Sequence, residues 1–491
     1  MAMGKRSDDP VQGELFVTSA DLPRSLGHPF YAKLNQLLAE AGFDGFVEST
    51  CVKFYDAKAG GGRPGIPPGN YFRMLFVGYF EGIDSQRGIA WRCADSLSLR
   101  EFLGLSWQEA SPDHSSLTRI RQRLDEGVHT AVFEWVLALC AEKKLLTDPT
   151  TVGVDSTTLE ANAAMRSIVR KDSKATYREY LKGLMQAEGT TEASGESPSK
   201  DSGPPPEPTV AEIVRFDRDR KDKSCSNADW ESPVDPDARI ARMKDGTTHM
   251  AYKAEHVADL KSEVILAAEI YPADQMDTQT LTDSVAAARC HLTQAGLTEL
   301  SVEAAAADKG YHTREQLALA ATYSIRTYVA EPDRPHRNRW AGRPAEQKDA
   351  VYANRRRVKG ERGKALQRLR SEKVERSFAH VCETGGSRRS WLRGLVKVRK
   401  RYAMAVAARN LGLVMRKVFG IGKPRVLQPE GSPGGGRSGS GGDGAGGGGN
   451  GEGNGPERPE NLLRRWLRWL RHLPAPAATY YRPIMASTVV A

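Results

Sequence analysis

Thr151-Val152-Gly153-Val154-Asp155 is a short apolar run that ends in a carboxylate. From residue 30 to about 144, before this run, the spacing of apolar residues is typical of helices. After it, strand-like runs occur at 249–257, 264–270 and 323–330, and another leads to residue 308, with a helix expected over 277–295. This order of strands and helices predicts an α/β core.

Two further acids stand in equally distinct positions. Asp308 ends the run Ala304-Ala305-Ala306-Ala307, and Glu375 lies in a helix-like stretch within a basic region. The three acids are 153 residues apart (155 to 308) and 67 apart (308 to 375), so only the fold can bring them together. A sheet does so when the first acid lies on its first strand, the second follows its fourth, and the third lies on a later helix. This is the arrangement of the ribonuclease H-like fold, and such an oxygen set suits Mg²⁺ or Mn²⁺.

The charge distribution favours a polyanionic partner. The 491-residue chain has 71 Lys and Arg against 61 Asp and Glu, a net charge of +10, which is a weak signal alone. Basic residues are dense over 355–373 and again over 388–401, on either side of Glu375. Charge runs are usually solvated helix faces, but an acid inside this one favours contact with phosphates.

Six scattered cysteines, none in a Cys-x-x-Cys pair, argue against a zinc ribbon or a disulfide framework. The N-terminus has no apolar signal-peptide stretch, and no run of apolar residues is long enough for a membrane span. We therefore expect a cytoplasmic protein, associated with the nucleoid when bound to DNA.

Composition predicts five segments. These are a flexible leader (1–27), a helical DNA-binding domain (28–145), a catalytic domain (146–420) with a disordered insertion at about 185–230, a disordered Gly-rich linker (429–460) and a basic amphipathic helix (461–473). The last helix suits a membrane surface, a partner protein or DNA equally well, or it is a tail without a role.

A helix pair is expected within the helical domain. Ser111-Pro112-Asp113 is a helix-start signal, and the helix after it carries Ser, Thr and Arg side chains on one side. Two helices joined by a short turn are compatible with helix-turn-helix DNA reading. An ordinary amphipathic pair in a helical bundle explains the pattern as well.

The chain resembles the bacterial insertion-sequence transposases with a DDE active site, over roughly residues 30–417. The resemblance rests on a series of motifs in order: 112–121, 154–163, 235–239 with 245–246, 252–253, 307–311, 374–378 with 393–395, and 408–411. It implies an all-helical N-terminal domain before a ribonuclease H-like catalytic core, with Asp155, Asp308 and Glu375 as the catalytic and metal-binding triad.

The resemblance also implies the reaction. Two Mg²⁺ ions, with Mn²⁺ as a substitute, would support cleavage at the element's terminal inverted repeats and 3′-OH strand transfer into a target duplex, by a homodimer or larger assembly on DNA. Repulsion between the carboxylates predicts weak metal binding without DNA. The expected DNA-binding residues are Arg119, Arg121, Lys309, Arg376, Arg388 and Lys397.

Several positions depart from the family pattern or leave alternatives. The Tyr, Arg and Lys that the family often shows around the glutamate are replaced by Arg368, Ser371 and Cys382. Asp259 is interpreted as a turn residue and Asp277 as a helix start, whereas His312 is close enough in sequence to approach the site. A metal-dependent nuclease and a catalytically silent DNA-binding relic share these features, although the intact triad argues against the relic.

Overall fold

The computed structural model describes residues 27–424 except 56–64, 107, 193–206, 222–224, 244–245, 333–339 and 341. The predicted leader, Gly-rich linker and C-terminal amphipathic helix lie outside these residues. The described part is a mixed α/β structure, as predicted at the level of α/β class.

The described residues before 143 form helices and no strand. They are α1 (Pro29–Glu40), α2 (Phe43–Cys51), α3 (Pro68–Glu81), α4 (Gln86–Asp95), α5 (Leu97–Phe102), α6 (His114–Arg123) and α7 (Glu126–Glu142). α6 begins where the sequence predicts, because the Asp113 side chain accepts a hydrogen bond from Ser116 N at 2.7 Å and caps the helix.

A mixed sheet follows, with the order β4-β5-β1-β7-β8 and β6 also paired with β5. β1 is antiparallel to β5, whereas β1, β7 and β8 are parallel. The strands are β1 (Thr151–Glu160), β4 (Arg239–Arg242), β5 (Thr248–Asp259), β6 (Ile265–Pro272), β7 (Ala304–Ala307) and β8 (Arg326–Val329).

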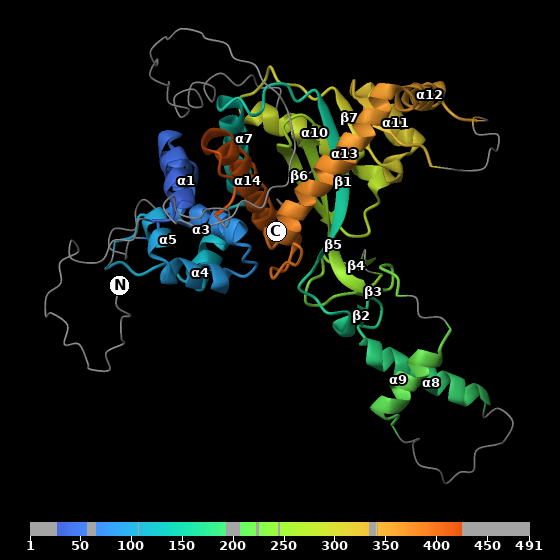
Figure 1. Cartoon of the computed structure of the whole chain (residues 1–491). Helices are drawn as coiled ribbons and strands as arrows, with labels where there is room; N and C mark the ends of the chain where they lie inside the picture. The colour runs from blue at the N-terminus through green and yellow to red at the C-terminus, as the bar shows by residue number, and fades with distance from the viewer. Residues whose placement is uncertain are drawn as a thin grey trace, which may run out of the picture.

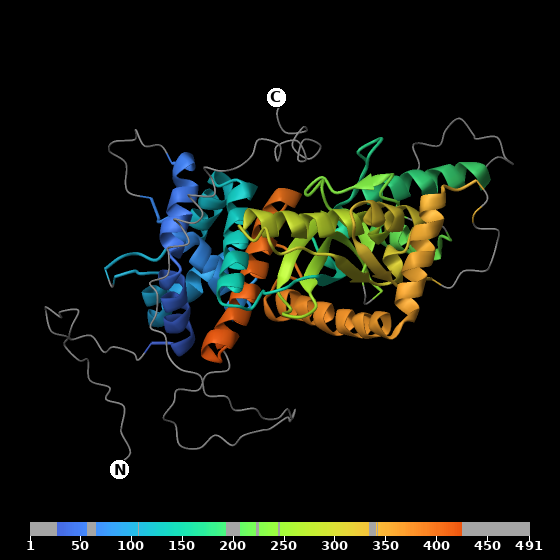
Figure 2. The same ribbon diagram turned by 90° about the horizontal axis from the view of Figure 1, so that it is seen from above.

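Helices cover both faces of this sheet. Figure 2 shows the strands between α10 (Asp277–Gln294) on one side and α13 (Glu361–Phe378) on the other. α11 (Arg314–Thr322) and α12 (Ala345–Lys359) pack together beside β8. α14 (Leu395–Phe419) packs against α3, α7 and β6, and so joins the helical part of the chain to the sheet.

At each edge of the sheet, an asparagine from a helix forms hydrogen bonds with the backbone of one strand residue. Asn354 on α12 bonds both the N–H and the C=O of Val329 on β8, at 2.9 and 2.8 Å. Asn410 on α14 bonds the N–H and the C=O of Ile265 on β6, at 3.1 and 2.9 Å. These amides satisfy edge groups that would otherwise need another strand.

An arm extends away from the sheet (Figure 1). It contains the paired strands β2 (Val169–Arg170) and β3 (Trp230–Glu231), and the helices α8 (Tyr177–Glu192) and α9 (Val210–Asp219). Residues 185–192 and 210–219, within the segment of 185–230 that was expected to be disordered, are helical instead. α9 forms despite the polar composition, because Thr209 and Glu212 make a capping box and Ile213 is buried.

Candidate active site

The strand register brings Asp155 and Asp308 to neighbouring positions. Val154 on β1 is paired with Ala307 on the parallel strand β7, and the two aspartates are the next residues. Asp155 is still within β1, opposite His256 of β5, whereas Asp308 follows the end of β7. The fold therefore joins two acids that are 153 residues apart in the sequence.

Local hydrogen bonds orient both aspartates. Asp155 Oδ1 accepts from Ser156 N at 2.9 Å, and Asp308 Oδ1 accepts from Gly310 N at 2.8 Å. Asp308 caps the short helix η3 (Lys309–Tyr311), which places the exposed Lys309 directly beside it.

α13 crosses β1 at Gly153, two residues before Asp155. A β-carbon on this glycine would lie 2.7 Å from Val374 Cγ2 and 3.2 Å from Arg370 Cγ, so only glycine permits so close an approach. From this position Arg370 Nη1 donates to Asp155 Oδ2 at 2.9 Å. A positive group therefore already contacts one carboxylate of the predicted triad.

Glu375 lies on a flank of α13 that does not contact the turn after β5. Lys373 and Arg376 contact Glu263 in this turn, which lies beside the start of β1, at 3.9 and 2.7 Å. With 3.6 residues per turn, Glu375 lies on the opposite flank of the helix. Its exposed side chain accepts a hydrogen bond from Ser371 Oγ at 3.0 Å.

The chemistry of these groups suits a hard divalent cation, because all three are carboxylates and Asp155 already binds a cationic group. The three are not gathered into a closed set of ligands: within the described residues, no cluster of three or more His, Cys, Asp or Glu side chains is placed to hold a metal ion. Glu375, being exposed, is the member with room to turn.

Asp277 lies beside the site, where the sequence predicted only a helix start. It is the first residue of α10, and its Oδ1 accepts from Ser156 Oγ at 2.8 Å and from Lys253 Nζ at 3.0 Å. A β-carbon on Gly310 would lie 3.3 Å from Asp277 Oδ2 and 3.0 Å from Asp308 Oδ1, so these oxygens are at most 6.3 Å apart. From the sequence, Asp277 was recognisable only as part of a helix start.

A buried network supports the loop after Asp308. Glu255 is fully buried, and its Oε2 accepts from Thr280 Oγ1 at 2.6 Å and from Tyr311 Oη at 3.0 Å. Burial raises the pKa of Glu255, and the nearby Lys253 ammonium opposes that shift. Sequence reasoning missed this network, because its members come from three separate elements.

A second buried network holds α13 on the sheet. His256 Nδ1 lies 2.8 Å from Ser377 Oγ, its Nε2 lies 2.8 Å from Tyr402 Oη, and its ring stacks on Phe378 at 3.9 Å. Burial keeps the pKa of His256 well below its usual value, so the ring is neutral. The helix that carries Glu375 is thereby fixed to the strand opposite Asp155.

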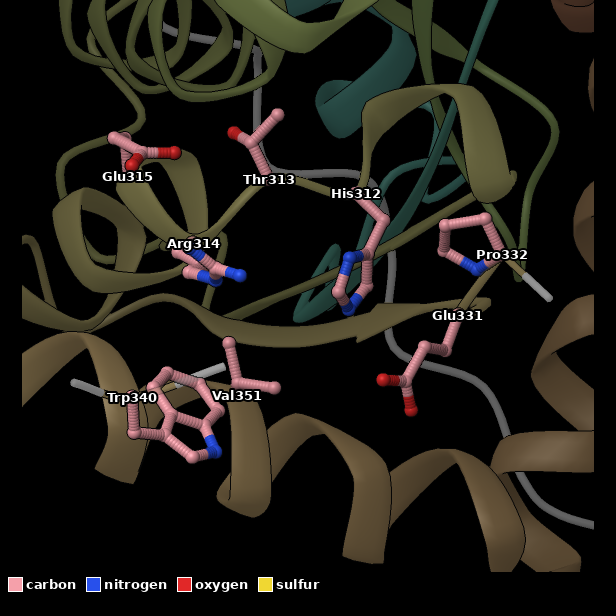
Figure 3. A pocket seen from close by; sticks show the side chains of 8 residues that line it. All are labelled: His312, Thr313, Arg314, Glu315, Glu331, Pro332, Trp340 and Val351. Carbon is pink, nitrogen blue, oxygen red and sulfur yellow. The ribbon is translucent and has the colours of Figure 1, made fainter. Parts of the chain in front are cut away.

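His312 lines a cavity of about 190 Å³ on the far side of η3. Figure 3 shows its ring together with Glu331, Trp340 and Val351 around this space. The Arg314 guanidinium lies over the Trp340 ring at 5.4 Å. His312 therefore belongs to the wall of a neighbouring cavity.

The expected DNA-binding residues differ in exposure. Arg119, Lys309, Arg376 and Lys397 are exposed. Arg121 is only 7% exposed, so its guanidinium is turned into the helical part and is not presented to a duplex. Arg388 donates to Thr157 Oγ1 and Thr158 O of β1 at 3.0 and 2.8 Å, which ties it to the strand that carries Asp155.

The predicted pair of helices joined by a short turn is not formed, because α5 lies between α4 and α6 in the chain. Thr118 Oγ1 on α6 donates to Gln86 Oε1 on α4 at 2.9 Å. Leu117 and Ile120 of α6 are buried, and Arg119 points outward between them.

Comparison with known proteins gives two family matches. Residues 20–123 match a transposase domain (DUF772), and residues 333–415 match a transposase DDE domain. The second match contains Glu375 and Arg370, whereas Asp155 and Asp308 precede it. No curated protein and no solved structure matches the chain.

The two matches identify the chain as an insertion-sequence DDE transposase, an enzyme that acts on DNA. This confirms the resemblance seen in the sequence. Transposases of this class generally use divalent metal ions. In the part of the chain that the structure describes, no helix is both long and apolar enough to span a lipid bilayer.

Proposed function

We propose that Asp155, Asp308 and Glu375 form the catalytic triad of a ribonuclease H-like core that cuts DNA at the element's ends and joins them to target DNA. The observation that carries this proposal is the pairing of Val154 with Ala307, which sets the two aspartates side by side beneath α13. The close contact of α13 with Gly153 supports the proposal, because it holds the helix that carries Glu375 on the strand that carries Asp155.

The three carboxylates would hold two divalent cations, Mg²⁺ or, as a substitute, Mn²⁺. When bound, such ions lower the pKa of the attacking water or hydroxyl and stabilise the leaving oxygen. The role of the protein is to hold these carboxylates in position beside one phosphodiester. Gly310 N and Ser156 N orient the aspartates, and the network around His256 holds the helix of Glu375.

Two successive displacements at this site account for cutting and joining. Water attacks the phosphodiester at the element's end, and the P–O bond to the 3′ oxygen breaks, leaving a 3′-hydroxyl and a 5′-phosphate. The 3′-hydroxyl then attacks a phosphodiester of target DNA, and a target P–O bond breaks as the new one forms. The second step exchanges one phosphodiester for another, so no nucleotide cofactor is needed.

The exposed basic residues would position the DNA. Lys309 lies beside Asp308 and is close enough to it to contact a phosphate next to the reacting one. Arg376 is exposed on the other flank of α13, where it pairs with Glu263, and would contact the duplex farther from the triad. Arg119 on α6 and Lys397 on α14 would contact the terminal inverted repeat farther away. Because joining requires two ends, we propose a homodimer or larger assembly on DNA.

Cleavage of a labelled duplex that carries the element's own terminal repeat tests this function. Wild-type protein in Mg²⁺ should cut at the repeat boundary and, with a target duplex present, give strand-joined products. Asp308→Ala should bind the repeat and give neither product. Wild-type protein that binds the repeat but never cuts it, in Mg²⁺ or Mn²⁺, would overturn the proposal.

A further inference from the structure

Arg370 forms an ion pair with Asp155, a carboxylate that the proposed cation needs. Its Nη1 lies 2.9 Å from Asp155 Oδ2, and the two side chains are only 12% and 21% exposed. The other Asp155 oxygen accepts from Ser156 N, so both oxygens have donors in this structure. While the guanidinium keeps this position, it lowers the affinity of Asp155 Oδ2 for a cation.

The position of Arg370 is fixed by packing as well as by charge. Its Cγ would lie 3.2 Å from a β-carbon on Gly153, so the aliphatic part of the side chain rests on β1. Its Nε is buried and has no hydrogen-bond partner among the described residues. The guanidinium therefore interacts with Asp155 through one end, and its hydrogen-bonding capacity is only partly used.

Elementary electrostatics determines what happens when a cation arrives. Arginine stays protonated, so it cannot give up its charge to relieve repulsion from a divalent ion. A guanidinium displaced from its partner at this low exposure would be an unpaired, partly buried charge, which is strongly unfavourable. A phosphate is the anion that the substrate brings to this site, and arginine binds phosphate through several N–H groups at once.

We propose that Arg370 is the resident counter-ion of Asp155 in the metal-free enzyme, competes with the divalent cation for that carboxylate, and passes to a DNA phosphate when the cation binds. This inference rests on the proposed function. Its consequence is coupling: the cation binds weakly until DNA supplies the new partner, and DNA binds more tightly once the cation has released Arg370.

Titration of the full-length protein with Mn²⁺ in the absence of DNA tests the competition without any catalysis. Arg370→Gln removes the competitor, so its Mn²⁺ affinity should rise by roughly tenfold, the scale of a charge-assisted hydrogen bond. Arg370→Lys keeps the charge and should give a smaller rise. Arg362→Gln, an exposed arginine near the start of the same helix, should match the wild type.

The coupling is measured by DNA binding with and without Ca²⁺, using the terminal-repeat duplex. Ca²⁺ should strengthen DNA binding by the wild type and by Arg362→Gln, and this gain should be largely lost in Arg370→Gln. If Arg370→Gln does not fold, as judged by circular dichroism, Arg370→Lys decides both measurements.

The outcomes separate this inference from the proposed function. If Asp155→Asn abolishes Mn²⁺ binding but neither Arg370 variant raises it, Arg370 is not a competitor and only this inference fails. Equal loss of the Ca²⁺ effect in Arg362→Gln and Arg370→Gln would also overturn it. If neither Asp155→Asn nor Asp308→Asn changes Mn²⁺ binding, the carboxylates do not hold the ion, and the proposed function fails as well.

Discussion

Gly153 on β1 and Val374 on α13 approach so closely that a β-carbon on the glycine would lie 2.7 Å from Val374 Cγ2. Leu260 Cδ2 would lie 2.8 Å from the same β-carbon, so the added atom would clash with two side chains at once. The first strand and the helix of the third acid are thus held together at one residue. The glycine at this position, two residues before Asp155, is a requirement of the proposed site.

Gly153→Ala should therefore destabilise the protein, because overpacking a filled contact costs about 1–3 kcal/mol. Chemical denaturation of the two proteins gives the difference in the free energy of unfolding. Gly183→Ala on α8 is the matched control: nothing lies within 4 Å of its β-carbon, and alanine should stabilise the helix by up to about 1 kcal/mol. Equal stabilities for wild type and Gly153→Ala would contradict the packing.

Asp277→Asn should lower both stability and cleavage. The change removes the charge that pairs with Lys253 Nζ at 3.0 Å, and the Lys253 side chain is only 7% exposed. Loss of a charge-assisted contact of this kind costs about 1–3 kcal/mol. Lys253→Met should be destabilising too, while the double variant should lose less than the two single variants combined, since no unpaired charge remains between them. Strict additivity in denaturation experiments would show that the two side chains do not interact.

His291 should make stability depend on pH. It lies on α10, with Nδ1 2.9 Å from Glu134 of α7 and Nε2 3.9 Å from Glu269 of β6. Burial alone would lower the pKa of His291, but bonds to Glu134 and Glu269 outweigh it and raise the pKa to about 9. Because the folded-state pKa exceeds the unfolded value, the stabilisation is complete below about pH 6.5 and is lost as pH rises toward 9.

Thermal unfolding at a series of pH values measures this effect. Wild-type stability should fall between pH 6.5 and 9, and His291→Gln, which is uncharged throughout, should lack this component. A His291→Gln curve parallel to the wild-type curve over that range would mean that His291 is not the group responsible.

The sequence predicted much of the sheet and both aspartates, because strands that end in an acid have a local signature. β1, β5, β6 and β7 lie where the apolar runs predicted them, and Asp113 caps α6 as expected. β1 continues past Asp155 to Glu160, since pairing with β5 extends it beyond its apolar residues.

Other features depend on contacts that no local pattern encodes. The hydrogen bond from Ser156 to Asp277 joins residues 121 positions apart, and the ion pair of Arg370 with Asp155 joins residues 215 apart. Arg121 is of a residue type that often contacts DNA, but it is buried. Tertiary packing, which no local pattern shows, decides which side of α6 is covered. The sequence did not predict α8 and α9, because their polar composition resembles that of disordered segments.

In the proposed site, Glu375 acts with two aspartates from distant strands. The most direct test is single-turnover cleavage of the terminal-repeat duplex by Glu375→Gln, with Glu361→Gln, an exposed glutamate on the same helix, as the control. Glu375→Gln should bind the duplex normally and cut it more than roughly 100-fold more slowly, beyond the loss typical of residues that only support a metal ligand. Glu361→Gln should cut at the wild-type rate. Equal cleavage rates for the two variants would contradict the account and exclude Glu375 from the site.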